Sequence, residues 1–175
     1  MIIQDVLLIN EDYCKQYSSI SWNVDAKYLV PCIISSQVQD LQQLIGTQLT
    51  KALCQKVQDQ TIGDAANAAY KELLDEYVQP FLLACTQAEL IIANMAKVRN
   101  SGTMQYLDTN QQNLTSRDTQ YFAQHYRDQA AFLGNRLTEW LKCNVANFPE
   151  YRQFCACCSG LKPDPISPAK VNIVL

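Results

Sequence analysis

Glycine and histidine are scarce in this chain, and the recognised catalytic motifs are missing. Its 175 residues include five glycines and one histidine. The isolated glycines form no G-x-G-x-x-G, P-loop or G-x-S-x-G motif, which excludes the usual phosphate-binding loops and the nucleophile elbow. His125 has no cysteine that the sequence marks as its catalytic partner. We therefore predict that the protein is not an enzyme and needs no cofactor.

An excess of basic residues is also missing. The chain has 14 lysines and arginines against 17 aspartates and glutamates, a net charge of −3. A protein that grips nucleic acid needs a basic face, so a general nucleic-acid binder is disfavoured. A protein that surrounds DNA without gripping it remains compatible. The hydrophobic share of 48% predicts a globular chain of one domain.

Membrane insertion is disfavoured as well. The most apolar window, residues 80–98, is interrupted by Thr86, Gln87, Glu89 and Asn94. A glutamate in the middle of a bilayer costs about 2.5–3.5 kcal/mol on insertion scales. Residues 1–9 are apolar but lack a basic start, so they do not resemble a secretory signal. We expect residues 80–98 to form a buried or inter-subunit helix of a protein that has no membrane partner.

Cysteine, in contrast, is abundant, with eight residues. Because the chain shows no signal peptide, we expect it in the cytosol, where thiols stay reduced. Four of them lie within apolar patterns and are predicted to be small core residues: Cys14, Cys32, Cys54 and Cys85. The other four are the weak candidates for a metal site: Cys143, Cys155, Cys157 and Cys158. Zinc sites use separated C-x2–4-C pairs, and this spacing differs. No metal ligands are therefore assigned.

Five runs of helical periodicity predict a mainly α fold, a bundle of about five helices. They cover residues 25–45, 47–58, 65–78, 80–98 and 118–144. Asn23 or Asp25 can cap the first run, and Gly46 ends or bends it. Residues 25–30 are predicted to form a preliminary turn, with the main helix starting near Val30 or Pro31, because proline fits the first turn of a helix. Its apolar stripe is Val30, Ile34, Val38, Leu41 and Ile45. The stripe of the last run is Phe122, Tyr126, Ala130, Leu133, Leu137 and Trp140.

The segments outside these runs divide the chain. Residues 1–24 are predicted to be extended, with a possible strand over 1–9, and residues 25–154 form the helical domain. Within that domain, residues 99–117 are polar and predict a β-hairpin or an exposed arm. Residues 155–175 form a tail rich in cysteine and proline, which favours extended backbone. Val171, Ile173 and Leu175 alternate at its end, a pattern that favours strand addition to a partner.

Four stretches carry a resemblance to a known family. They are "NVDAKYLVPCIISSQVQDLQQLIGTQLTKAL", "YKELLDEYVQPFLLACTQAEL", "VRNSGTMQYLDTN" and "LTEWLKCNVANFPEYRQF", in that order between about residues 20 and 154. Their order and small apolar motifs resemble the head–tail connector (neck adaptor) proteins of tailed bacteriophages, of the kind found in crAss-like and other Bacteroidetes phages. The "CACC" segment and the proline-rich tail depart from that pattern, which leaves the outer contacts open.

The resemblance implies a structural protein of the virion neck, present in the host cytoplasm during assembly. Copies of the chain would form a ring, usually of twelve, beneath the portal protein, with the tail or further neck proteins on the other side. The ring would extend the channel, and genomic DNA would pass through it without sequence-specific binding. Two alternatives remain open: a cytosolic helical-bundle binding or regulatory protein, and a metal protein that uses the cysteine cluster.

Overall fold

A computed structural model describes residues 2–99, 102–105 and 116–151, and the prediction of a mainly α-helical bundle is confirmed. In chain order its elements are α1 (Ile2–Asp5), α2 (Glu11–Tyr17), α3 (Ala26–Ser36), the π-helix η1 (Gln37–Leu41), α4 (Gln42–Ile45), α5 (Thr47–Gln58), the 3₁₀ turn η2 (Ala65–Asn67), α6 (Ala68–Glu72), the π-helix η3 (Leu73–Val78), α7 (Gln79–Met95), the strands β1 (Ala96–Arg99) and β2 (Gly102–Gln105), α8 (Ser116–Cys143) and the 3₁₀ turn η4 (Val145–Asn147).

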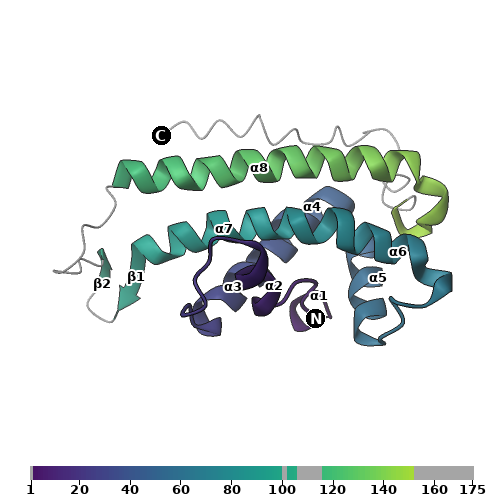
Figure 1. Cartoon of the computed structure of the whole chain (residues 1–175), viewed down its shortest axis with the longest axis horizontal. Helices are drawn as coiled ribbons and strands as arrows, with labels where there is room; N and C mark the ends of the chain where they lie inside the picture. The colour runs from purple at the N-terminus through teal and green to yellow at the C-terminus, as the bar shows by residue number, and fades with distance from the viewer. Residues whose placement is uncertain (1, 100–101, 106–115, 152–175) are drawn as a thin grey trace.

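Helix α7 is the middle layer of the fold. It packs against α8 on one side and against α3 on the other, and the two-stranded hairpin follows its end (Figure 1). Every residue from 81 to 88 is buried. A helix that is buried around its whole circumference needs neighbours on all sides, which α8, α3 and η1 provide. The expectation of a buried helix over residues 80–98 is thus confirmed for its first half.

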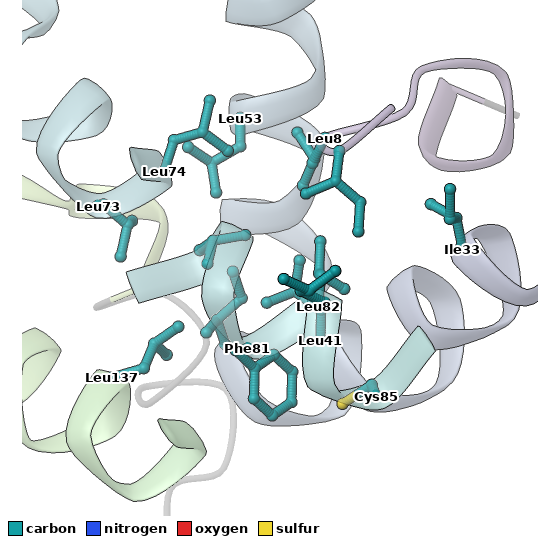
Figure 2. Close-up of a cluster of buried hydrophobic side chains, with 14 of the residues drawn as sticks. Leu8, Ile33, Leu41, Leu53, Leu73, Leu74, Phe81, Leu82, Cys85 and Leu137 are labelled. Carbon is teal, nitrogen blue, oxygen red and sulfur yellow. The ribbon is translucent and has the colours of Figure 1, made fainter. Parts of the chain in front are cut away.

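The core collects side chains from distant parts of the sequence. Figure 2 shows Leu8 from the N-terminal segment, Leu41 from η1, Leu53 from α5 and Leu82 from α7 pointing toward one another. Leu41, Leu53 and Leu82 have no solvent exposure. Burying a leucine side chain contributes about 1.5–3 kcal/mol, so this convergence is the main source of stability.

Residues 2–24 are not extended, and the prediction of a strand over residues 1–9 is wrong. This segment forms the short helices α1 and α2, which bury Ile3, Leu8, Ile9 and Cys14. Helix α2 begins where the Asn10 side chain accepts a hydrogen bond from the Tyr13 N–H, at 2.8 Å. Because the segment lies against the core, residues 2–24 belong to the domain and not to a separate extended arm.

Gln37 fixes this segment through one buried amide. Its Nε2 donates to the carbonyl oxygens of Ile3 at 2.6 Å and Val6 at 2.8 Å, and its Oε1 accepts from the Leu8 N–H at 3.0 Å. Gln37 has no solvent exposure. A buried backbone group without a partner costs about 1–3 kcal/mol, so this one side chain makes burial of three such groups possible.

The helix that contains Pro31 begins earlier than predicted. It starts at Ala26 after the N-cap residue Asp25, so Pro31 lies in its second turn. Proline removes one backbone hydrogen bond there, and its exposed position allows water to replace the missing donor. Gly46 separates α4 from α5 with φ 85° and ψ 155°, a region that other residues almost never adopt. The predicted end of the first run at Gly46 is confirmed.

The stripe predicted for the first run is correct at Leu41 and Ile45, but before them the true buried line runs one residue earlier in the chain. Leu29, Ile33, Gln37, Leu41 and Ile45 are all fully buried at steps of four residues. The predicted residues Val30, Ile34 and Val38 are half-buried. The polar Gln37 interrupts the buried line, so hydropathy alone selects the neighbouring stripe.

The third and fourth runs form one continuous helical stretch. The π-helix η3 precedes Pro80, and the Gln79 N–H bonds to the carbonyl of Leu74, five residues back. This wider turn lies where the proline ring would otherwise meet the carbonyl four residues before it. The predicted break between the runs at residues 65–78 and 80–98 is therefore an expanded turn that keeps the helix continuous into α7.

Small residues bring α8 close to α7. A methyl group added at Gly134 would lie 3.1 Å from the Phe81 ring and 3.4 Å from Leu44. The buried line of α8 continues through Ala123, Ala130 and Leu137. The predicted α8 stripe is therefore correct at Ala130 and Leu137. It is wrong at Phe122, which is 43% exposed, because the small residues face α7 instead.

An aromatic cluster lies at the C-terminal end of α8. The Phe148 ring lies 5.0 Å from Tyr70 and 5.6 Å from Trp140, and Trp140 stacks on Tyr77 at 4.7 Å. The Tyr70 hydroxyl donates to Glu150 Oε2 at 2.8 Å. Aromatic pairs of this kind contribute about 0.5–1.5 kcal/mol beyond their buried area. The turn after α8 is therefore held against α6 and η3.

The arm begins with a β-hairpin, one of the two predicted forms. Strands β1 and β2 pair antiparallel, with Ala96 opposite Gln105 and Arg99 opposite Gly102. The hairpin starts three residues before the predicted boundary at 99, and Ser116 and Arg117 already belong to α8. Residues 106–115 of the predicted arm lie outside the described residues.

Charge placed on the buried line of the first run should unfold the domain. Leu41→Asp and Ile45→Asp each introduce an unpaired carboxylate at a position with no solvent exposure. We expect each variant to lose several kcal/mol of unfolding free energy. The exposed neighbour Gln39→Asp is the matched control and should stay within about 0.5 kcal/mol of the wild type. Denaturant unfolding measures all three, and wild-type midpoints for both buried variants would refute the packing described.

Candidate assembly surfaces

Helix α8 presents aromatic side chains to solvent on the side opposite its buried line. Tyr121 is 72% exposed and Phe132 is 69% exposed. Eleven residues make almost three whole turns, so the two share one stripe, half a turn away from Ala123 and Ala130. His125 is exposed between them. We call Tyr121, His125 and Phe132 the α8 surface.

A second aromatic surface lies on the opposite outer layer. Tyr17 ends α2, Trp22 lies in the connector to α3, and Tyr28 is in the first turn of α3; their exposures are 61%, 63% and 44%. Figure 1 shows α2 and α3 on the far side of α7 from α8. We call these three residues the α2–α3 surface. Tyrosine and tryptophan are the side chains that contribute most often to binding energy at protein interfaces.

A groove of about 430 Å³ lies between the connector and the two long helices. Its apolar lining comes from Ile20 and Val24 of the connector, Leu90 and Ile91 of α7, and Phe122 of α8. The connector reaches α8 because Ser19 Oγ and the Tyr126 hydroxyl lie 3.1 Å apart and form a hydrogen bond. All side chains that line the groove are uncharged. The groove therefore suits an apolar segment better than a charged ligand.

The prediction that four of the cysteines are core residues is confirmed. Cys14, Cys32, Cys54 and Cys85 are buried, and Cys143 is exposed. Burial raises the pKa of Cys14 and of Cys54 to about 11. A thiol with so high a pKa stays protonated at neutral pH and is a poor nucleophile and metal ligand.

Of the candidate metal ligands, Cys143 alone is described, since Cys155, Cys157 and Cys158 lie outside the described residues. Within the described part of the chain, no three histidine, cysteine, aspartate or glutamate residues lie close enough to hold a metal ion. The weak candidate cluster of four cysteines therefore stays a prediction.

One exposed aspartate with a raised pKa lies where η1 meets α7. Asp40 retains solvent contact, yet its pKa is raised to about 6, mainly by burial of the carboxyl group and then by the negative charge of Glu89. A hydrogen bond to the Cys85 side chain and the positive charge of Arg127 oppose this shift. Asp40 is therefore an electrostatic cost to folding near neutral pH.

None of the helices in the described ranges combines the length and the hydrophobicity that a bilayer crossing requires.

Sequence patterns alone did not single out either aromatic surface. Tyr121 and Phe132 lie off the predicted stripe of the last run, and eleven-residue spacing of two off-stripe aromatics is the signal that could have identified them. Trp22 lies in a segment predicted to be extended, where exposure has no periodic signature. His125 is exposed beside the Tyr126 ring, with 5.5 Å between ring centroids.

These features define a class: a three-layer, mainly α-helical protein with exposed aromatic side chains on both outer layers. The chain belongs to DUF6712, a family of unknown function, whose model matches residues 41–160. No curated protein and no solved structure matches the chain. The matched region runs from the end of η1 through α8, so it contains the α8 surface and lies after the α2–α3 surface.

The raised pKa of Asp40 predicts how stability depends on pH. The folded-state pKa of about 6 exceeds the ordinary value of 3.8, so the folded protein binds the proton more tightly than the unfolded chain. Stability should therefore fall as pH rises through this window and stay reduced above it. Asp40→Asn should be more stable than the wild type at pH 7.5, and the gain should vanish at pH 3.5. Urea unfolding at both pH values checks this. Equal stability at pH 7.5 would contradict it.

Proposed function

We propose that the protein is a structural subunit that assembles with copies of itself, with the role of a head–tail connector in the neck of a tailed phage. The observation that supports this most is the pair of exposed aromatic surfaces on the two outer layers. Exposed aromatic side chains bring a large apolar area to the surface, and tyrosine and tryptophan are enriched among the residues that dominate binding energy at interfaces.

Two different surfaces favour a ring over a simple dimer. A two-fold dimer uses one surface that contacts its own copy, whereas a ring joins one surface to a different surface of the next copy. The α8 surface and the α2–α3 surface differ in sequence and geometry, and they lie on opposite sides of α7. A head-to-tail contact would bury both at once, and repetition of that contact closes a ring when the rotation divides a full turn.

The resemblance supplies the setting of this proposal. Connector proteins form a ring, usually of twelve copies, between the portal protein and the tail or further neck proteins. In that setting the chain acts in the virion neck, after assembly in the host cytoplasm, and has no enzymatic activity. Its net charge of −3 fits a channel through which DNA passes, because many phosphate contacts would hold the DNA back.

Substitution of one exposed aromatic side chain on each surface tests the proposal. Phe132→Glu and Trp22→Glu place a charge at the centre of a contact that the ring needs. Hot-spot residues of this type contribute at least about 2 kcal/mol, so each variant should weaken association by roughly 30-fold or more. Light scattering and sedimentation velocity measure the association. Thermal unfolding should show folded variants, because both side chains are exposed.

Each variant has a matched control on the same element. Gln120→Glu adds the same charge to an exposed position of α8 that lies more than a quarter of a turn away from the α8 surface, and Asn23→Glu adds it to an exposed position of the connector. Both controls should assemble like the wild type. A wild-type chain that stays monomeric at all concentrations, alone and with portal protein, would overturn the proposal.

A further inference from the structure

We propose that the groove beneath the α2–α3 connector binds residues 171–175 of the same chain. The groove is uncharged, its exposed lining is mostly apolar by area, and it is built from three separate segments, the connector, α7 and α8. Its volume of about 430 Å³ lies within the range of about 300–1,000 Å³ that is typical of ligand sites. This inference concerns a single subunit and does not depend on ring formation.

The connector also offers backbone groups to an extended segment. Among the described residues, the carbonyl oxygens of Ser19 and Ile20 accept no hydrogen bond, although the Ile20 N–H donates to Ser18 Oγ at 3.1 Å. An extended peptide that lies along the connector can donate to such carbonyls while its alternate side chains enter the groove. The site therefore combines an apolar lining with free acceptors at its edge.

Residues 171–175 fit the chemistry of this site. Their sequence is "VNIVL", with Val171, Ile173 and Leu175 on one side of an extended strand and no charged side chain. Of the 24 residues that follow Tyr151, this stretch of five is the most hydrophobic, and Asn172 is its one polar residue. The groove and residues 171–175 are therefore complementary, because both lack charged side chains and both present mainly apolar surface.

The intervening residues are long enough to make this contact within one subunit. The groove lies beside residues 119–126 of α8, and the 17 residues from Tyr126 to Cys143 span about 26 Å of helix. Residues 152–170 would span about 59 Å as extended polyproline-type backbone, and their mean end-to-end distance as a flexible chain is about 24 Å. A tether whose mean length matches the span gives the highest effective concentration, in the millimolar range.

Radical footprinting of the full-length chain tests the contact. Phe122 is 43% exposed when the groove is empty, so bound residues 171–175 should protect it. We expect Ile173→Asp to increase labelling of Phe122 several-fold, because it places a carboxylate in the apolar lining. The matched control Asn172→Asp alters the neighbouring residue on the other side of the strand and should leave labelling unchanged. Tyr17, which does not line the groove, is the internal reference in every sample.

Repetition in the Phe132→Glu background separates this contact from contacts between copies. Protection of Phe122 that persists in a monomeric variant supports binding within one chain. Protection that disappears on dissociation assigns the groove to a neighbouring copy and overturns the proposal. Equal labelling of Phe122 in the wild type and in Ile173→Asp overturns it in either background, whatever the oligomeric state.

Discussion

Burial of α7 on all sides is the constraint on which the rest of the structure depends. Positions 81–88 have no solvent-facing side, so the helix must be covered by two layers. The sequence provides them differently: α8 brings small side chains such as Ala130 and Gly134, and the α3–η1 helix brings larger ones such as Ile33 and Leu41. A consequence is that the large aromatics of α8 are left for its outer face.

The N-terminal segment packs behind the layer that covers α7. Helix α1 covers α5 and η1, and its backbone is tolerated in the core because Gln37 bonds to Ile3, Val6 and Leu8. One polar side chain therefore links residues 2–9 to the helix that covers α7. The connector that follows then crosses to α8, where Ser19 and Tyr126 form a hydrogen bond. In this position the connector forms one wall of the groove.

Sequence reasoning was strongest where local rules act. The helix of residues 47–58, the break at Gly46 and the four buried cysteines follow from periodicity, glycine geometry and the hydrophobicity of thiols, and all are confirmed. The predictions failed where a contact between distant parts of the chain determines which side chains are buried. Gln37 is buried because of backbone groups 29 to 34 residues away, and Phe122 is displaced from the core because Gly134 allows α7 to come close. The sequence did not predict the aromatic surfaces, because the exposed face of a helix such as α8 depends on which of its faces packs against α7.

In the proposed ring, the α8 surface of one copy contacts the α2–α3 surface of the next. The most direct measurement is to mix Phe132→Glu with Trp22→Glu and determine the mass of the complex by sedimentation velocity. Each variant keeps the surface that the other lacks, so the account predicts monomers in the separate samples and a complex of two chains in the mixture. A mixture that stays monomeric, or a single variant that assembles alone like the wild type, would contradict it.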